Sequence, residues 1–335
     1  MATYKDIHGN NIPIRSSDPS NPILGEAWYN STTHIFKVRG FAPGTWTTGN
    51  NMAGTPLRNF QSTGSYTSAV VNGGVSSTAH INQTNEWDGT NWATGNGSPI
   101  SGYGRCGFGT QTAAVFAGGQ NGPSTLYNTI NEYDGTNWTS SPGTLAQPTR
   151  SARGVGTQTA GFFCGGSSGD PPTVLNQSYT YDGTCVAAVT SMPTTRQQHG
   201  GGGSTQDSFI AYGGQVPPSN SATNSTISWN GSSWTTVNAM NNPSGPMTTG
   251  TMSSSTSALS AANSWPSVTP NEQWDGTCWT VIANLNTQRE SACGSGTGAN
   301  AFCAGGYDNS GGDQNTEATE LWSGAAAATQ TVTTA

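Results

Sequence analysis

A short aromatic-Asp-Gly segment recurs along the chain at nearly constant spacing, and this repetition constrains the fold more than any other feature. Its clearest copy is Glu86-Trp87-Asp88-Gly89-Thr90-Asn91-Trp92. The aromatic residue at the start of each copy stands at Trp87, Tyr133, Tyr181, Trp229, Trp274 and Trp322. These positions lie 45 to 48 residues apart, a period typical of propeller arrays. The repeat therefore predicts one body of stacked units rather than several unrelated domains.

Each unit contains the residues expected for four strands. In the second unit, a Gly-rich run over residues 105–112 precedes an apolar run that ends at Gly118-Gly119. Residues 120–129 then form a polar loop, and Tyr133-Asp134-Gly135 leads to Trp138. Asp-Gly between two aromatic-bearing runs indicates a short hairpin. We therefore expect Trp92, Trp138, Trp234 and Trp279 to begin the fourth strands and to fill the space between neighbouring units.

One unit departs from the pattern. A Gly-Gly pair ends the second strand in the units at Gly73-Gly74, Gly118-Gly119, Gly165-Gly166, Gly213-Gly214 and Gly305-Gly306. The fifth unit lacks the pair, and residues 253–262 carry its strand in degenerate form. We expect this unit to be the least regular.

The two ends of the repeat region suggest how a ring would close. The segment Thr45-Trp46-Thr47-Thr48 resembles a fourth strand that precedes any first unit, whereas a third strand ends near Trp322 with only an Ala- and Thr-rich tail behind it. Either segment could complete the last unit, which would avoid exposed strand edges. We favour the segment around Trp46 as the closing strand, with residues 325–335 partly ordered.

The Gly-Gly doublet, the aromatic residue after it and the Trp a few residues later resemble kelch-like propellers, including the central domain of the galactose-oxidase group. This resemblance spans about residues 46–335 and implies an all-β, six-bladed kelch-like β-propeller. Residues 1–45 would form a separate arm and hairpin. A copper-radical oxidase of that group needs two histidines at one metal, but two of the four histidines, His8 and His34, precede the propeller. We therefore expect no copper site and no cofactor.

The N-terminal segment suggests a biological context. Residues 25–38 contain two apolar-alternating runs around an Asn-Ser-Thr-Thr turn, which is the pattern of a β-hairpin. Within it, Trp28-Tyr29-Asn30 resembles a segment near the N-termini of tail-fibre and structural proteins of tailed bacteriophages. The resemblance implies that residues 1–45 attach the chain to other virion proteins, with Trp28, Tyr29 and Asn30 as attachment residues.

The function expected on this basis is that of a virion structural protein in a tail, fibre or capsid surface, present in many copies and made in the host cytoplasm. Its propeller loops would bind a host-surface glycan or protein without catalysis. Two alternatives stay open: a cellular kelch-like adaptor or lectin, and a glycan-active hydrolase.

Composition excludes several partners. Charged residues make up only 8% of the chain, the net charge is −7, and the only lysines are Lys5 and Lys37. A chain without a basic stripe is not expected to bind nucleic acid. No long apolar window indicates a signal peptide or a membrane span. The six cysteines fall at equivalent repeat positions, which predicts free thiols that fill the core.

An arginine near the first strand of most units is the most suggestive set of charged residues. Its members are Arg58, Arg105, Arg150 or Arg153, Arg196 and Arg289. First strands line a propeller axis, so Arg58, Arg105, Arg196 and Arg289 could form a binding ring at the mouth of the channel. Alternatively, each guanidinium pairs with a carbonyl or acidic group of the fold.

Two further sets of residues are weaker candidates. Asp308 and Asp313 lie in an Asp/Asn/Gly segment that resembles a calcium loop but lacks its terminal Glu, so a polar loop is the alternative. The loops after each Gly-Gly are long and rich in Asn, Ser and Pro, and Tyr127 and Tyr307 are candidate ligand contacts there. Loops on one face of a rigid ring often carry recognition. The sequence predicts no catalytic residue, and Asp308 and Asp313 are only weak candidates for metal ligands.

Overall fold

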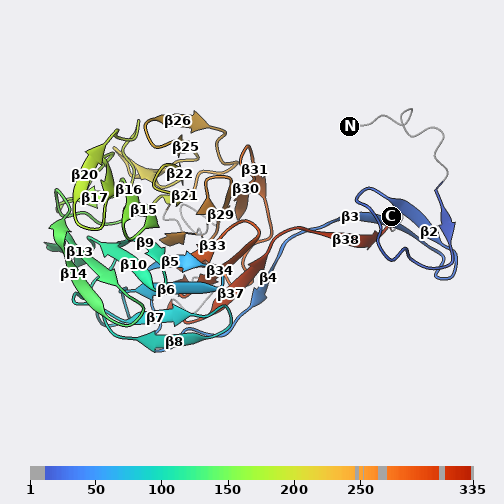
Figure 1. Cartoon of the computed structure of the whole chain (residues 1–335), viewed down its shortest axis with the longest axis horizontal. Helices are drawn as coiled ribbons and strands as arrows, with labels where there is room; N and C mark the ends of the chain where they lie inside the picture. Colours follow the sequence, from blue (N-terminus) through green and yellow to red (C-terminus); the bar gives the residue numbers. More distant parts are fainter. Residues whose placement is uncertain (1–11, 246–248, 252, 263–269, 309–313, 333–335) are drawn as a thin grey trace. The chain divides into compact units, whose positions relative to one another are not determined.

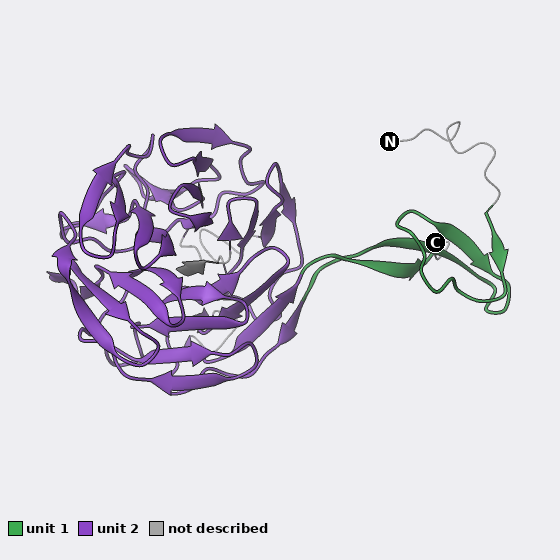
Figure 2. Ribbon diagram, in the orientation of Figure 1, with its two compact units in different colours: residues 1–45, 324–335 green, residues 46–323 purple. Residues whose placement is uncertain are grey.

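The computed structural model describes residues 12–245, 249–251, 253–262, 270–308 and 314–332. The chain forms two compact units, which are coloured separately in Figure 2. Unit 1 contains residues 1–45 and 324–335, and unit 2 contains residues 46–323. All regular elements in the described part of the chain are β-strands.

Unit 1 is a single four-stranded sheet in the order β1-β2-β3-β38 (Figure 1). Its strands are β1 (Ile14–Arg15), β2 (Ala27–Asn30), β3 (Ile35–Ala42) and β38 (Ala326–Thr331). β2 and β3 pair antiparallel from Ala27↔Val38 to Asn30↔Ile35, which confirms the predicted hairpin.

The division of the chain differs from the predicted one at the C-terminus. The prediction places residues 325–335 with the propeller, whereas β38 pairs antiparallel with β3 along six residues, from Lys37↔Thr331 to Ala42↔Ala326. A strand of Ala, Thr and Gln carries no apolar alternation, so no pattern in the sequence indicates this partner.

The main sheets of unit 2 have four strands each, apart from one that gains a fifth, and they are arranged around a common centre in Figure 1. We number them sheet 1 to sheet 6 along the chain. Sheet 1 contains β5 (Gln61–Ser65), β6 (Ser68–Asn72), β7 (Thr84–Trp87) and β8 (Trp92–Gly95). Sheet 2 contains β9 (Cys106–Thr110), β10 (Ala113–Ala117), β13 (Thr129–Tyr133) and β14 (Trp138–Thr144). Sheet 3 contains β15 (Arg153–Thr157), β16 (Ala160–Cys164), β19 (Ser178–Tyr181) and β20 (Val186–Val189).

The remaining sheets follow the same order. Sheet 4 contains β21 (Gly200–Thr205), β22 (Ser208–Tyr212), β25 (Thr226–Trp229) and β26 (Trp234–Val237). Sheet 5 contains β28 (Ser253–Ser254), β29 (Ser257–Ser260), β30 (Glu272–Trp274) and β31 (Trp279–Val281). Sheet 6 contains β33 (Cys293–Gly296), β34 (Asn300–Ala304), β37 (Thr319–Ser323) and, at its outer edge, β4 (Thr45–Thr48).

The repeated Asp-Gly turn has the geometry that its residues predict. Asp88 Oδ1 accepts the backbone N–H groups of Thr90 at 2.8 Å and Asn91 at 2.6 Å, and these bonds lower the pKa of the carboxyl group. Gly89 has a φ of 94°, a conformation that side chains disfavour. The turn therefore fixes the register between third and fourth strands.

The core lies between neighbouring sheets. Phe162 of sheet 3 packs on Phe209 of sheet 4 with ring centroids 5.3 Å apart, and Trp87 of sheet 1 packs on Phe302 of sheet 6 at 5.6 Å. The fourth-strand tryptophans add bonds across the same junctions, since Trp138 Nε1 donates to Thr84 Oγ1 at 3.2 Å. The expected packing of these tryptophans between units is confirmed.

Sheet 6 is completed from the N-terminal side of unit 2. β4 is the neighbour of β37, and the Trp46 indole donates at 3.1 Å to the carbonyl of Ala283, which follows the last strand of sheet 5. Trp46 also packs on Trp322, with ring centroids 5.3 Å apart. The favoured outer strand is thus the one observed, and the arrangement is consistent with a β-propeller.

Sheet 5 is irregular, as the missing Gly-Gly predicts. Its first strand, β28, has two residues, and the preceding β27 (Thr249–Thr251) instead pairs parallel with β33 of sheet 6. Ala262 adopts a positive φ of 56° after the second strand, where other units have glycine. The first strand of this unit is therefore divided between two sheets.

The loops after the second strands are more ordered than expected. They contain two-stranded sheets formed by β11 (Gln120–Asn121) with β12 (Thr125–Leu126), β17 (Ser167–Ser168) with β18 (Thr173–Val174), and β23 (Gln215–Val216) with β24 (Ser221–Ala222). In the last unit, β32 (Arg289–Glu290), β35 (Tyr307–Asp308) and β36 (Gln314–Asn315) form a three-stranded sheet.

Candidate functional site

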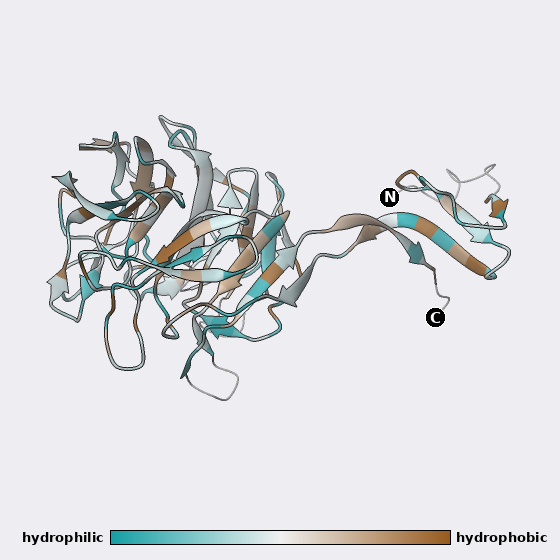
Figure 3. Cartoon of the chain, turned by 60° about the horizontal axis from the view of Figure 1, so that its bottom comes forward, coloured by the Kyte–Doolittle hydropathy of each residue, from teal (hydrophilic) through white to brown (hydrophobic). Residues whose placement is uncertain are grey.

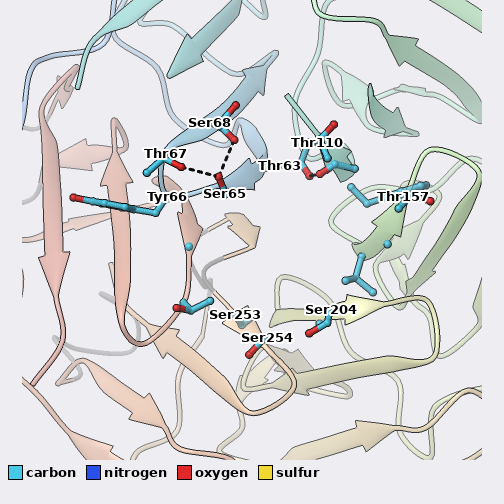
Figure 4. A pocket seen from close by; sticks show the side chains of 18 of the residues that line it. Thr63, Ser65, Tyr66, Thr67, Ser68, Thr110, Thr157, Ser204, Ser253 and Ser254 are labelled. Atoms are coloured by element: carbon cyan, nitrogen blue, oxygen red, sulfur yellow. Dashed lines mark hydrogen bonds between the residues drawn. The ribbon is translucent and has the colours of Figure 1, made fainter. Parts of the chain in front are cut away.

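A pocket of about 720 Å³ lies where the first and second strands of all six sheets of unit 2 are joined (Figure 4). Its lining consists of the turn residues and the ends of the first strands. These residues are Thr63, Gly64, Ser65, Tyr66, Thr67, Ser68, Phe108, Gly109, Thr110, Val155, Gly156, Thr157, Gly203, Ser204, Ser253, Ser254, Gly296, Thr297 and Asn300. The predicted recognition loops join second to third strands, so they lie at the opposite end of each second strand.

A Gly-Ser or Gly-Thr doublet builds most of these turns. The doublets are Gly64-Ser65, Gly109-Thr110, Gly156-Thr157, Gly203-Ser204 and Gly296-Thr297, and sheet 5 has Ser253-Ser254 instead. Gly156 has a φ of 103°, and a Cβ there would lie 2.2 Å from the Ala160 carbonyl oxygen. Glycine is therefore required, and the next residue presents its hydroxyl to the pocket.

The repeated aromatic residue before Asp-Gly supports the same turns from behind. The Trp87 indole donates to the Tyr66 carbonyl at 2.7 Å, and Trp322 donates to the Gly298 carbonyl at 2.8 Å. Trp229 and Trp274 make the equivalent bonds to Gln206 and Ser255 at 3.1 Å. The most conspicuous sequence motif thus positions the pocket without entering it.

The pocket surface is uncharged and rich in hydroxyl groups. Figure 4 shows serine and threonine side chains from several sheets around the central space. Phe108 and Val155 add buried apolar surface, and the half-buried Tyr66 supplies an aromatic ring. None of the described lining residues is Asp, Glu, Lys, Arg or His. Such a surface can form neutral hydrogen bonds and apolar contacts with a ligand.

Three of the four arginines of the predicted ring are buried in the fold. Arg105, Arg196 and Arg289 are 1%, 0% and 1% exposed, and none of them lines the pocket. Arg289 forms a 2.5 Å ion pair with Glu320 and donates to the Ala318 carbonyl at 2.7 Å. The alternative interpretation, that each guanidinium pairs with groups of the fold, agrees with these contacts.

Arg105 shows the same structural use. Its guanidinium donates to the side-chain oxygens of Asn72 at 2.9 Å and Asn131 at 2.6 Å, and to the Phe116 carbonyl at 2.7 Å. Burial lowers the pKa of this group to about 9. Arg196 donates to the Ser225 carbonyl at 3.3 Å.

The arginines also occupy different positions in their units. Arg58 forms an isolated bridge with Val75, and the equivalent bridges of other units are made by Tyr103, Arg150 and Gln197. Arg58 is half-buried and stacks over the ring of Tyr307 at 4.7 Å. Relative to this bridge position, Arg105 is displaced by two residues, and Arg196 and Arg289 are displaced by one. The arginines therefore do not share one position in the repeat.

The loop candidates are partly packed against the fold. Tyr127 and Tyr307 are half-buried, and Tyr307 is the residue under Arg58. Asp308 lies in β35, where its backbone is the strand-pairing partner of Arg289 in β32 and of Gln314 in β36. Asp313 falls outside the described residues. Among the described residues, no group of three or more His, Cys, Asp or Glu side chains is arranged to hold a metal ion.

Trp28 and Asn30, expected as attachment residues, are buried inside unit 1. Both donate to Asp18 Oδ1, from Trp28 Nε1 at 3.1 Å and from Asn30 Nδ2 at 2.8 Å. Lys37 Nζ forms an ion pair with Asp18 Oδ2 at 2.5 Å. These three partners lower the pKa of Asp18 to about 2. Trp28 and Asn30 therefore have a structural role in unit 1, and of the three residues only the half-buried Tyr29 remains partly accessible.

Sequence reasoning missed Asp18 and the pocket turns. Asp18 precedes Pro19 in a turn cluster, and nothing local indicates that its carboxylate joins two strands. The repeated Gly-Ser or Gly-Thr doublet was visible and could have indicated the pocket, because it recurs at the same place in five units.

The cysteine prediction holds only in part. All six cysteines are free, and Cys106, Cys164, Cys293 and Cys303 are buried as expected. Cys185 and Cys278 are exposed, because they stand in the turn after Asp-Gly-Thr rather than on a strand facing the core.

His199 is fully buried, with Nδ1 2.9 Å from the Gly200 carbonyl oxygen, and burial lowers its pKa to about 3. It is therefore a neutral residue directly before β21.

None of the described residues belongs to a helix long and apolar enough to span a membrane.

Comparisons with known proteins show the fold and nothing more. No family model matches the sequence, and no curated protein matches it. The solved structure of YjhT, a kelch-like β-propeller protein, matches with a TM-score of 0.66 and covers 82% of this chain and 96% of that chain. The identity is 10%, so the likeness extends to the all-β propeller-type architecture but not to activity.

Proposed function

We propose that unit 2 is a closed, six-bladed kelch-like β-propeller in which sheets 1 to 6 are the blades. The supporting observation is that sheet 1 packs against sheet 6 through Phe60, Trp87, Cys293 and Phe302. Trp46 acts as the fourth-strand tryptophan of the last blade. Asn50, just after β4, donates to the Thr90 carbonyl of blade 1 at 3.0 Å, as Asn96 donates to the Thr136 carbonyl of blade 2 at 2.8 Å.

The propeller binds a neutral, hydroxyl-rich ligand, namely a glycan, in the pocket at its axis. The observation that carries this proposal is the uncharged ring of serine and threonine hydroxyls with Tyr66 at its edge. Sugars present hydroxyls for hydrogen bonds and apolar ring faces for aromatic contact, and pockets of this size suit small ligands. An anionic glycan would lack a cationic partner among the described lining residues.

Binding rather than hydrolysis is the activity that we propose. Most glycoside hydrolases use two carboxylic side chains on either side of the scissile bond. The described lining residues offer hydroxyl, amide and aromatic groups instead. A glycan-active hydrolase remains the alternative that the binding experiment must distinguish.

In this proposal, unit 1 attaches the chain to a larger assembly, and that assembly is a bacteriophage virion. The support for a virion is the Trp28-Tyr29-Asn30 resemblance of the hairpin. The support for a separate module is that both ends of the chain belong to unit 1. Purified particles should contain many copies of the chain, and capsid and tail genes should flank its gene. Flanking genes of cellular metabolism would favour an adaptor or lectin instead.

A glycan panel tests the binding function. The full chain should bind neutral oligosaccharides and show little affinity for sialylated or sulfated ones. Tyr66→Ala should weaken binding roughly tenfold, since aromatic anchors dominate binding free energies. Tyr127→Ala removes a tyrosine from the loop end and should leave binding unchanged.

Three results would contradict the proposal. Binding confined to anionic glycans would exclude a neutral ligand, and loss of binding only in Tyr127→Ala would place recognition on the loops. Products of glycan cleavage, detected by mass spectrometry after incubation, would show an enzyme.

A further inference from the structure

The sheet of unit 1 has one face without charged residues. Residues paired across neighbouring strands project to the same side of a sheet. Ile14 pairs with Tyr29, Tyr29 pairs with Phe36, and the Val332 N–H donates to the Phe36 carbonyl at 3.0 Å. A row of four apolar or aromatic side chains therefore crosses the whole sheet, and we call it the apolar row.

The next row on this face has the same character. Ala27 pairs with Val38, and Val38 pairs with Gln330. The opposite face carries Trp28, Asn30 and Lys37, which surround Asp18. The strands of unit 1 accordingly show alternating hydrophobic and hydrophilic bands in Figure 3.

The apolar row is accessible to a partner. Ile14 is 74% exposed and Val332 is 44% exposed, and Tyr29 and Phe36 are half-buried. Among the described residues, the exposed large hydrophobic side chains of unit 1 are Ile12, Ile14, Ile23, Leu24, Phe41 and Val332, whereas the much larger unit 2 contributes Val281. Soluble proteins seldom expose a continuous apolar patch unless it contacts something.

A single sheet with one apolar face needs a second layer. Stable domains bury such a face against another sheet or helix. Within the described part of unit 1, only this one sheet is present. The apolar row is therefore incomplete as a core, and a partner must supply its other half.

Charge favours an identical chain as that partner. An uncharged face can pack on a copy of itself about a two-fold axis without bringing like charges together. The remainder of the molecule opposes self-association, since unit 2 holds fourteen of the seventeen acidic residues but six of the ten basic ones. Residues 1–45 and 324–335 hold the other three acidic and four basic residues, so unit 1 is the region where copies can approach.

We propose that the face containing Ile14, Tyr29, Phe36 and Val332 packs against the same face of a second copy of this chain. Sheet-on-sheet packing would then complete the core of unit 1. β38 lies at the edge of this sheet and contains no charged residue or proline to discourage association. This inference concerns unit 1 and holds whatever ligand unit 2 binds.

Sedimentation equilibrium of the full chain tests the proposal. The wild-type chain should sediment as a dimer at micromolar concentration. The double variant Ile14→Lys/Val332→Lys should raise the dissociation constant roughly 100-fold or more, because two like-charged pairs would meet at the interface. Both side chains are exposed, so unit 1 should still fold, as judged by the Trp28 indole N–H resonance.

Phe41→Lys is the matched control. Phe41 is an exposed residue of β3, 58% accessible, but it lies on the face of Lys37 and Arg39. The Phe41→Lys variant should remain dimeric. A wild-type chain that is monomeric up to roughly 100 μM, a double variant that stays dimeric, or equal dissociation by Phe41→Lys would each overturn the proposal.

Discussion

At the scale of single residues, two residues determine local structure that the repeat pattern does not predict. Asp18 accepts hydrogen bonds from Trp28 and Asn30 and pairs with Lys37, so one carboxylate joins both strands of the hairpin. Gly156 allows a turn whose φ of 103° leaves no room for a Cβ. Each leads to a prediction.

Unit 1 should lose stability as pH falls from about 4 to about 2. The pKa of Asp18 is lowered from 3.8 to about 2 in the folded chain, so its contribution is complete above the unfolded pKa and disappears as the folded carboxylate is protonated. Amide hydrogen exchange of β2 and β3 should accelerate over this range. Asp18→Asn should remove most of that pH dependence.

Glu26→Gln is the control for this measurement. It removes the partly exposed ion pair between Glu26 and Arg15, which is expected to contribute little. Unchanged exchange in wild type down to pH 2, or equal effects of the two variants, would show that Asp18 does not stabilise the hairpin.

Gly156→Ala should lower the free energy of unfolding by roughly 1–3 kcal/mol, because the new Cβ would collide with the Ala160 carbonyl. Gly122→Ala offers a matched comparison, since Gly122 has a φ of 71° but open space around its missing Cβ. Its cost should be about 1 kcal/mol. Urea unfolding measures both, and equal costs would contradict the steric argument.

At the scale of strands and sheets, the sequence repeat predicted the positions of those residues that every unit uses in the same way. Trp92, Trp138 and Trp279 pack between sheets, and their places could be predicted because every unit needs the same filling. The arginines could not be placed by the same logic. A shift of one residue in a strand reverses the face of a side chain, so similar spacing did not give a common ring.

Other elements lack any local signature. β38 consists of Ala, Thr and Gln and finds its partner β3 nearly three hundred residues earlier in the chain. The small sheets in the loops, such as β11 with β12, have two residues per strand. Such short, polar strands are specified by tertiary contacts, and no sequence pattern distinguishes them from irregular loops.

Trp46→Ala should destabilise unit 2 by about 3–5 kcal/mol, the usual cost of removing a buried aromatic residue. Trp46 is 6% exposed and joins the outer strand of sheet 6 to sheet 5. Val281→Ala, at a residue 50% exposed on β31, should change stability by less than about 0.5 kcal/mol. Tryptophan fluorescence during urea unfolding measures both, and similar midpoints would exclude Trp46 as the closing residue.

At the scale of the whole molecule, the residues that build the fold differ from the residues that line the pocket. Residues that recur most faithfully, the aromatic-Asp-Gly turn and the fourth-strand Trp, build sheets and junctions. The residues beside them, the hydroxyl-bearing partners of the turn glycines, face the pocket. The sequence drew attention to the loops after Gly-Gly, whereas the described pocket lies at the other end of the second strands.

The most direct test of this account is calorimetric titration of the full chain with a neutral oligosaccharide that it binds. Thr157→Trp places a large ring at the pocket lining, and Thr136→Trp places the same ring in an exposed Asp-Gly-Thr turn outside it. The account predicts that Thr157→Trp abolishes measurable binding and that Thr136→Trp binds as the wild type does. Wild-type affinity in Thr157→Trp would contradict it.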